Sequence, residues 1–312
     1  MKVHSLSAQA LQQKLNAEGL YLRTGGFVSR IQSSISSVAD GIALMYGDYP
    51  LESTTDFADF HVSLRPPANL RRWVKQQVQF YFDGLTPFKP LAIEHAFPML
   101  EWGLNWCVTS YTNRYLIFHA AVVEKHGYAM IMPGSPGSGK STLCAALVNR
   151  GWRLLSDELT LVSLSDGSII PLPRPVSLKN ESIEVIRQFS SDVVIGRISH
   201  DTAKGTVAHM RVPTAHIERA AESARPAWVV FPKFVSGAAL SLEPLSKGHG
   251  TIRLIDNSFN YSILSTKGFT SVTGLIDQCD CYDFKYSVLD EAVERFDSLA
   301  EARRDEVNGQ ND

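Results

Sequence analysis

The chain has 312 residues, of which 44% are apolar, so it can build one large packed domain or two ordinary ones. Its 30 basic and 32 acidic residues nearly cancel, which excludes a global electrostatic attraction to nucleic acid or to a membrane surface. No apolar run reaches the roughly eighteen residues that span a membrane and no secretory signal pattern begins the chain, so we expect a cytoplasmic protein with no membrane span and no nucleic-acid partner.

The first third of the chain predicts a small α+β arrangement. Apolar and polar residues alternate around the Gly25-Gly26 pair, a pattern typical of a hairpin with one solvated face. Trp102 and Trp106 stand four residues apart in a helical segment, where we interpret them as packing residues. The expected elements are a hairpin over residues 19–32, helices over 34–46 and 98–108, and a strand over 57–64.

From residue 118 onward, the pattern predicts two hairpins around one helix. Short polar stretches at 124–127 and 165–168 separate β-rich runs, and Gly151 stands where a helix ends. The polar stretch 189–214 has little periodicity and predicts a long mobile loop. The expected elements are strands over 121–123, 128–132, 153–156, 159–164, 169–172 and 229–231, a helix over 142–150, a helix and then a strand within 275–286, and a final helix that Ser287 caps with Asp290 in the reciprocal position.

The cysteines predict neither disulfides nor a metal centre. The chain contains only Cys107, Cys144, Cys279 and Cys281, which are too few and too scattered for a disulfide framework, so we expect reduced thiols. Cys279 and Cys281 form a C-x-C pair, but no second pair accompanies it. We therefore assign no zinc to the sequence.

A glycine-rich loop between the first hairpin and the helix that follows it matches G-x-x-x-x-G-K-[ST] at every fixed position. The glycines let backbone N–H groups converge on phosphate oxygens, the helix N-terminus adds a positive dipole end, and Lys140 reaches the β and γ phosphates. We therefore predict ATP as the ligand, Mg²⁺ as its metal ion, and the Ser141 hydroxyl as a Mg²⁺ ligand. The predicted nucleotide-binding residues are Gly134, Ser135, Pro136, Gly137, Ser138, Gly139, Lys140, Ser141 and Thr142.

The acidic pair Asp157-Glu158 ends the strand that follows the loop helix. We expect this strand to lie beside the phosphate-loop strand and to bring the pair to the γ-phosphate region. In a hydrolytic P-loop ATPase the pair would handle Mg²⁺ and activate water, whereas in a kinase Asp157 would accept the proton of a hydroxyl group. ATPases normally place such a pair further along the chain and alternate strand with helix, so the two hairpins favour the kinase.

The segment from His119 to Glu158 resembles HPr kinase/phosphorylase. The resemblance lies in His119-Ala-Ala, the hairpin, the loop of residues 134–141, and the run Arg150-Gly-Trp-Arg-Leu-Leu-Ser-Asp157-Glu158. It implies the fold of the P-loop kinases related to phosphoenolpyruvate carboxykinase, with a mixed sheet. It also implies that Asp157 is the catalytic carboxylate, able to act as a base in phosphorylation, and that His119 lines the same pocket.

The sequence also departs from that family. Glu158 stands where the family has a second aspartate, and we assign it with Ser141 to the Mg²⁺ side of the site. The chain contains no copy of the family's C-terminal HPr-docking segment, so HPr is not the favoured substrate. Residues 57–62, 101–106 and 173–180 instead resemble the HPr-kinase-related proteins found with exosortase and extracellular-polysaccharide systems, whose substrate the resemblance does not supply.

Two further segments are candidates for the site. Arg174 and Lys179 follow the second hairpin, and a cation near a transferring phosphoryl group would stabilise its charge. The alternative for both residues is ordinary surface charge on a loop. Residues 204–209 lie in the unpatterned stretch, where they would either close over a substrate or form a flexible connector.

These observations predict an α/β chain with an N-terminal α+β domain over residues 1–112, a P-loop kinase domain over 113–304 and a polar tail over 305–312. The expected activity is transfer of the γ-phosphoryl group of ATP to a hydroxyl acceptor, either a protein Ser or Thr or a small-molecule alcohol. The alternatives are a P-loop ATPase and a non-catalytic ATP-sensing module. The sequence leaves open the identity of the acceptor and whether the protein is a homo-oligomer.

Overall fold

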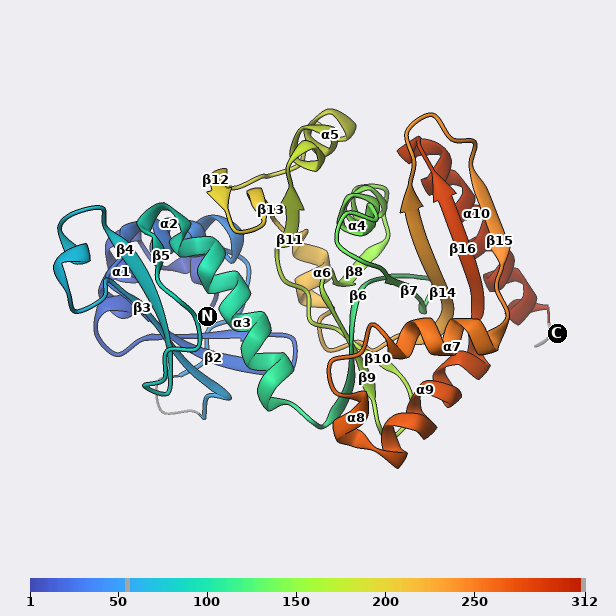
Figure 1. Ribbon diagram of the computed structural model, residues 1–312, viewed down its shortest axis with the longest axis horizontal. Helices are drawn as coiled ribbons and strands as arrows, with labels where there is room; N and C mark the ends of the chain where they lie inside the picture. Colours follow the sequence, from blue (N-terminus) through green and yellow to red (C-terminus); the bar gives the residue numbers. More distant parts are fainter. Residues whose placement is uncertain (54–56, 310–312) are drawn as a thin grey trace. The chain divides into compact units, whose positions relative to one another are not determined.

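The structure, a computed structural model, describes residues 1–53 and 57–309, and its chain divides into two compact units (Figure 1). The first unit comprises Met1–Thr112, Arg174–Arg187 and Asp192–Ala220. The second unit comprises Asn113–Pro173, Gln188–Ser191 and Ala221–Asp312. The expected kinase domain of residues 113–304 therefore includes two segments that pack with the first unit.

The first unit begins with a five-stranded sheet in the order β1-β2-β3-β4-β5. β1 and β2 form the expected antiparallel hairpin, with Leu20 opposite Ile31, and α2 and α3 confirm the two expected helices. β3 pairs in parallel with β2 and antiparallel with β4, so the sheet is mixed. The elements are η1 Val3–Ser5, α1 Ala8–Asn16, β1 Leu20–Thr24, β2 Phe27–Ser33, α2 Ser36–Met45, β3 Phe60–Arg65, η2 Leu70–Arg72, β4 Gln77–Phe82, β5 Leu91–Ala92, η3 Ile93–His95 and α3 Ala96–Tyr111.

A three-stranded sheet in the order β11-β13-β12 completes the first unit. Its elements are β11 Val176–Lys179, α5 Glu181–Phe189, β12 Ser199–Thr202, β13 Gly205–Met210 and α6 Thr214–Glu218. The expectation of a loop over 189–214 was therefore wrong. β12 is short and polar and the last four residues of β13 are all buried, so neither strand shows the alternation that predicts a half-buried strand. Gly205, at φ +84°, allows the tight turn between them.

The second unit is built on an eight-stranded mixed sheet in the order β10-β9-β6-β7-β14-β16-β15, in which β8 also pairs with β6. β7, β14 and β16 are mutually parallel, and the remaining pairs are antiparallel (Figure 1). The strands are β6 Tyr115–Lys125, β7 Tyr128–Pro133, β8 Arg153–Ser156, β9 Leu159–Ser163, β10 Ile169–Ile170, β14 Arg225–Phe234, β15 Ser241–Pro244 and β16 Asp280–Tyr286. The helices are α4 Lys140–Asn149, α7 Lys247–Ile255, α8 Tyr261–Leu264, α9 Thr266–Gln278 and α10 Leu289–Asn308.

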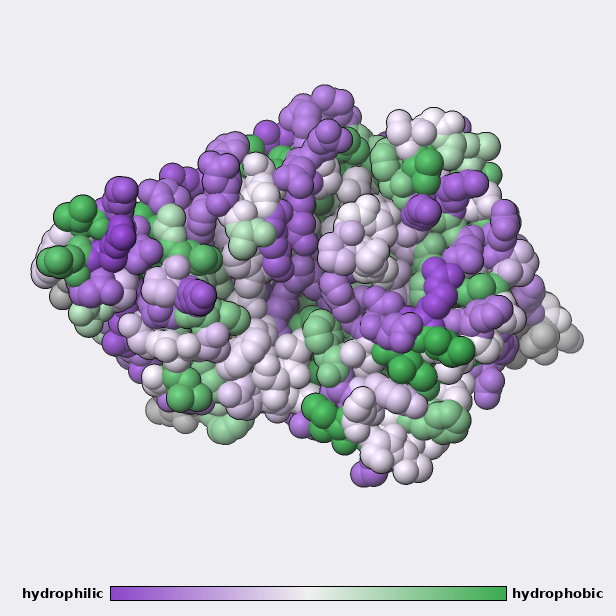
Figure 2. Space-filling view, viewed as in Figure 1, coloured by the Kyte–Doolittle hydropathy of each residue, from purple (hydrophilic) through white to green (hydrophobic). Residues whose placement is uncertain are grey.

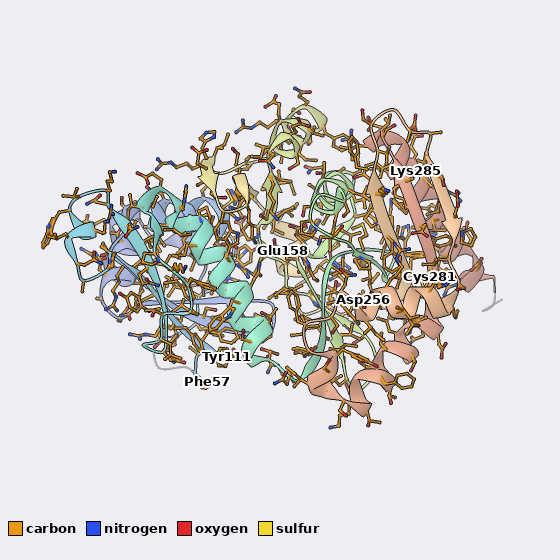
Figure 3. The ribbon with its side chains drawn as sticks, in the orientation of Figure 1. Phe57, Tyr111, Glu158, Asp256, Cys281 and Lys285 are labelled. Carbon is orange, nitrogen blue, oxygen red and sulfur yellow. The ribbon has the colours of Figure 1, made fainter. Side chains whose placement is uncertain are left out.

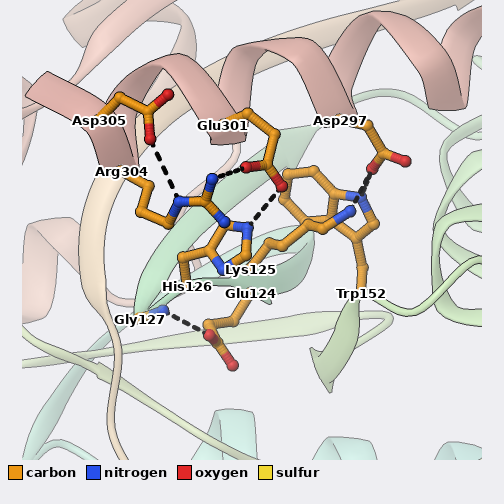
Figure 4. Close-up of polar contacts among 9 residues, drawn as sticks. All are labelled: Glu124, Lys125, His126, Gly127, Trp152, Asp297, Glu301, Arg304 and Asp305. Carbon is orange, nitrogen blue, oxygen red and sulfur yellow. Dashed lines mark hydrogen bonds and ion pairs between the residues drawn. The ribbon is translucent and has the colours of Figure 1, made fainter.

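The C-terminal helix α10 is held against the β6–β7 turn by polar contacts (Figure 4). Asp297 Oδ1 accepts hydrogen bonds from Lys125 Nζ and Trp152 Nε1, both at 2.7 Å. Ser287 does not cap this helix as expected, because its hydroxyl donates to the carbonyl of Ala238 at 2.7 Å and Val288 occupies the cap position. Side-chain contacts to the hairpin, rather than a capping box, therefore fix α10.

Exposed apolar side chains gather on α7, α8 and α9 of the second unit, where Figure 2 shows green residues. They are Ile252, Phe259, Ile263 and Phe269. Within the described part of the chain, no helix is both long and apolar enough to cross a membrane.

Candidate functional site

The glycine-rich loop joins β7 to α4 at the carboxyl edge of the parallel strands. Gly137 and Gly139 adopt φ values of +86° and +90°, which favour glycine. A Cβ at Gly139 would also lie 2.5 Å from the Tyr286 hydroxyl. The loop therefore requires glycine at position 139 for both backbone and packing reasons. A Cβ at Gly134 would lie 2.7 Å from the Ser138 Oγ, so that hydroxyl would have to move.

Lys140 is only 7% exposed and its ammonium group lies beneath the loop. Nζ lies 3.1 Å from His119 Nε2 and donates to the carbonyl of Gly134 at 3.3 Å. An ammonium group can only donate, so Nε2 of His119 must be the acceptor, and the neutral ring carries its proton on Nδ1. The structure thus brings together two residues that the sequence places 21 positions apart.

His119 lies on β6, at the register position opposite Leu159 of β9. Its backbone N–H donates to the carbonyl of Asn257 at 2.7 Å, and its ring centroid lies 5.9 Å from that of Phe259. Asn257 and Phe259 follow α7 and were not singled out from the sequence, because no local pattern relates them to a residue 140 positions earlier. Phe259 is about half-exposed, and its ring lies beside the imidazole ring of His119.

The acidic pair Asp157-Glu158 occupies the junction between β8 and β9. Both strands pair antiparallel with β6, with Ser156 opposite Val122 and Leu159 opposite His119. The expectation that β8 lies beside the phosphate-loop strand was wrong, because β6 separates it from β7. The pair still reaches the strand that carries His119. Asp157 is buried, at 4% exposed, and Glu158, labelled in Figure 3, is half-buried.

Cys144 on α4 is a buried thiol whose pKa is shifted by burial and by two charged residues. Burial raises the pKa of the Cys144 thiol well above its usual range, the Asp157 carboxylate raises it further, and the Lys140 ammonium lowers it. Both charged groups are therefore close enough to the sulfur to act on it.

Ser141 and Glu158, the residues expected to hold Mg²⁺, come from different elements of the second unit. Ser141 is the second residue of α4, and Glu158 is half-buried at the β8–β9 junction. Across residues 1–53 and 57–309, no three His, Cys, Asp or Glu side chains cluster to hold a metal ion. Mg²⁺ in kinases is usually bound by one or two protein oxygens together with phosphate oxygens. A hydroxyl and a carboxylate would therefore be sufficient protein ligands for a nucleotide-bound ion.

Arg174 and Lys179 belong to the first unit. The Arg174 side chain is 7% exposed and forms an ion pair with Glu101, Nη2 to Oε2 at 2.6 Å, while Nη1 donates to Asn105 at 2.5 Å. The guanidinium group therefore donates to partners within the first unit, and these contacts account for its burial without a bound phosphate. Lys179 ends β11, where its N–H donates to Ser182 Oγ at 2.7 Å.

Residues 204–209, expected as a closing loop or connector, lie mostly in β13. His209 is buried, and its ring stands edge-on to Phe97 with centroids 5.4 Å apart. The expectation of a mobile segment there was wrong, because strand pairing with β11 and β12 fixes it.

Two aromatic residues that the sequence analysis missed contact the loop. The Phe234 N–H donates to the carbonyl of Ser138 at 2.9 Å, and the Tyr286 hydroxyl donates to the carbonyl of Gly139 at 3.0 Å. They end β14 and β16, the two strands parallel to β7, and that topology would have predicted their place at the loop.

Comparison with known proteins adds a weak structural likeness. No protein-family model matches the chain, and no curated protein matches it. Among solved structures, the chain is similar to the Hpr(Ser) kinase/phosphatase from Coxiella burnetii, with 12% identity and a TM-score of 0.27, over 62% of this chain and 98% of that one. A TM-score this low supports no inference about activity. The mixed α/β architecture rests on the strand pairings described above.

Proposed function

We propose that the chain is an ATP-dependent kinase that moves the γ-phosphoryl group to a hydroxyl acceptor. The observation that carries this proposal is the contact of Lys140 with His119 beside a glycine-rich loop at the carboxyl edge of parallel strands. Asp157 lies at the junction of two strands that pair with the strand of His119. The sequence resemblance of residues 119–158 to HPr kinase/phosphorylase supports the same activity. The 3.1 Å contact between Lys140 and His119 supports a common pocket for the two side chains.

The loop and α4 supply the phosphate site. Successive backbone N–H groups at the left-handed glycines and at the start of α4 form a concave, positively polarised surface suited to phosphate oxygens. Lys140 adds a full positive charge. Binding of the triphosphate would exchange His119 Nε2 for a phosphate oxygen as the acceptor of the Lys140 ammonium group.

Asp157 is the proposed base. Its carboxylate would accept the proton of the acceptor hydroxyl while the new oxygen–phosphorus bond forms and the bond between the β–γ bridging oxygen and the γ phosphorus breaks, so that ADP leaves. Burial restricts access of water to this carboxylate.

Ser141 and Glu158 are the proposed protein ligands of Mg²⁺. The ion supplies positive charge that offsets the negative charge of the phosphate oxygens. The Ser141 hydroxyl and the Glu158 carboxylate are both oxygen donors, and they flank the loop and the acidic junction respectively.

The acceptor is proposed as a protein Ser or Thr or a small-molecule alcohol other than HPr. Glu158 in place of the family's second aspartate supports an acceptor other than HPr. The segments at residues 57–62, 101–106 and 173–180 support a relationship to the HPr-kinase-related proteins of exosortase and extracellular-polysaccharide systems.

The test of this proposal combines γ-labelled ATP, Mg²⁺, the purified full-length chain and a lysate of its own host. Transfer of label to a protein band or to a small molecule is the expected result. In Asp157→Asn, transfer should fall by about 10² to 10⁴, the usual contribution of a general base, while ATP affinity stays nearly unchanged.

Glu158→Gln is the matched control at the neighbouring position. It should raise the Mg²⁺ concentration needed for half-maximal rate more than it lowers the rate at saturating Mg²⁺. Parental transfer by Asp157→Asn, with the whole rate loss in Glu158→Gln, would overturn the kinase mechanism. Release of inorganic phosphate without any labelled acceptor would instead identify an ATPase.

A further inference from the structure

A cavity of about 700 Å³ opens beside the phosphate loop in the second unit. One wall is the loop itself, from Pro133 to Ser138, and another is formed by Phe231–Phe234 of β14 and Asp283–Lys285 of β16. Small-ligand sites typically have volumes of roughly 300 to 1,000 Å³. The cavity is therefore large enough for a ligand that extends beyond the loop.

The cavity extends from the loop over the carboxyl ends of β14 and β16, and Asp256 and Asn257 at the end of α7 also line it. β7 lies between β6 and β14, and β6 carries His119 and pairs with the strands that flank Asp157. β14 and β16 run parallel to β7, so their carboxyl ends meet at the edge where the loop begins. Ligands of such sheets bind outside the carboxyl ends of the parallel strands. A nucleotide whose terminal phosphate faces Asp157 would extend its other end over β14 and β16.

Phe234 stands at that end with its ring accessible. The side chain is 49% exposed, although its backbone N–H is bonded to Ser138 of the loop. Its ring lies edge-on to Tyr286, with centroids 5.7 Å apart and an interplanar angle of 70°, and the Tyr286 hydroxyl bonds to Gly139. An aromatic ring is thus fixed against the phosphate loop with one face uncovered by Tyr286.

Polar groups line the remainder of the cavity. Arg253 Nη1 donates to Asp283 Oδ1 at 2.6 Å, and the Arg253 guanidinium covers the ring of Phe231 at 3.8 Å. Phe231 is therefore already stacked, which leaves Phe234 as the accessible ring. Lys285 lines the cavity and Cys281 does not. Figure 3 shows these two residues at opposite ends of β16.

We propose that this cavity is the nucleoside subsite of the phosphate loop, and that the base of the nucleotide stacks on Phe234. This inference rests on the proposed nucleotide-dependent function and deepens it. Stacking on an aromatic face tolerates any base, because every base has a π-face. Phe234 therefore contributes affinity for the nucleoside, while the loop and Lys140 bind the phosphates.

The test compares the binding of two ligands to the full-length chain by calorimetry in the presence of Mg²⁺. ATP has a base, and inorganic tripolyphosphate has the same phosphates without one. Phe234→Ala should weaken ATP binding by about 5- to 150-fold, the fold-change that base–aromatic stacking supplies, and should leave tripolyphosphate binding within about twofold of the parent. Phe234→Trp should retain ATP binding, and Phe234→Leu, which keeps an apolar side chain of similar bulk, should lose it as Phe234→Ala does.

Phe269→Ala is the matched control, because Phe269 is 56% exposed on α9 of the same unit but does not line the cavity. Lys140→Ala should weaken both ligands. Unchanged ATP affinity in Phe234→Ala and Phe234→Leu, or equal losses for both ligands, would overturn the subsite. A parent chain that binds neither ligand would overturn the phosphate site as well. Selective loss of ATP binding in a chain that transfers no phosphate would uphold the subsite and reject the kinase.

Discussion

Arg174 shows how far a residue type can be interpreted without its partners. A cation after a hairpin suggested a phosphate contact, but the side chain pairs with Glu101, which lies 73 positions earlier on α3. No local pattern encodes that partner. The loop residues 134–141 are different, because their spacing alone specifies the backbone shape and the position of Lys140. Sequence could therefore predict the glycine-rich turn between β7 and α4, whereas the partners of Arg174 required the fold.

Replacement of Arg174 should destabilise the first unit. Arg174→Met leaves the buried Glu101 carboxylate without its guanidinium partner, and breaking a buried pair from one side typically costs about 3 to 5 kcal/mol in the free energy of unfolding. Denaturant unfolding measures this change. The double variant Arg174→Met with Glu101→Met should recover part of the loss, because both charges are removed. A stable Arg174→Met chain with weakened ATP binding would restore the phosphate-contact interpretation.

Strands and helices with strong local patterns could be predicted from the sequence, but their partners could not. The hairpins around Gly25-Gly26 and residues 124–127 follow from turn residues between β-rich runs. The pairing of β8 with β6 rather than β7 is a non-local choice, set by the antiparallel path of β6 past both β8 and β9. β12 and β13 were missed because their burial does not alternate. The position of the acidic pair at the end of β8 could therefore be predicted, while the pairing that brings it to β6 could not.

The attachment of α10 to the β6–β7 hairpin predicts the effect of Asp297→Ala. This change removes the acceptor of Lys125 Nζ and leaves the buried Trp152 indole N–H without its 2.7 Å partner. An unsatisfied buried donor costs about 1 to 3 kcal/mol, so the free energy of unfolding should fall by that amount. Asp305→Ala on the same helix removes only an exposed contact to Arg304 and should change stability by less than about 0.5 kcal/mol. Equal effects of the two changes would contradict the anchoring role.

The whole chain consists of two units whose segments alternate along the sequence. Residues 174–187 and 192–220 leave the second unit, form β11, β12 and β13 with the first, and return. A boundary near residue 112 can be inferred from the change in sequence pattern there. A discontinuous unit cannot, because residues 174–187 and 192–220 are assigned to the first unit only by contacts between segments distant in the sequence. The cysteines divide between the units, with Cys107 in the first and Cys144, Cys279 and Cys281 in the second.

This division predicts how nucleotide binding redistributes stability. All four thiols are buried, and burial raises the pKa of Cys107 to about 12 and those of the other three above their usual range. Because the thiolate is the reactive form, alkylation at pH 8 should be slow for all four until their unit unfolds. In a denaturant series with brief iodoacetamide pulses, mass spectrometry then reports each unit separately.

A ligand that binds only the native second unit stabilises it by about 2.7 kcal/mol at one hundred times its dissociation constant. ATP with Mg²⁺ should therefore move the labelling midpoint of Cys144, Cys279 and Cys281 to higher denaturant and leave that of Cys107 in place. Lys140→Ala serves as the control, since it should abolish the shift without exposing any thiol in the native chain. Equal shifts at all four cysteines would show that the units unfold as one cooperative body, and a shift confined to Cys107 would place the nucleotide in the first unit.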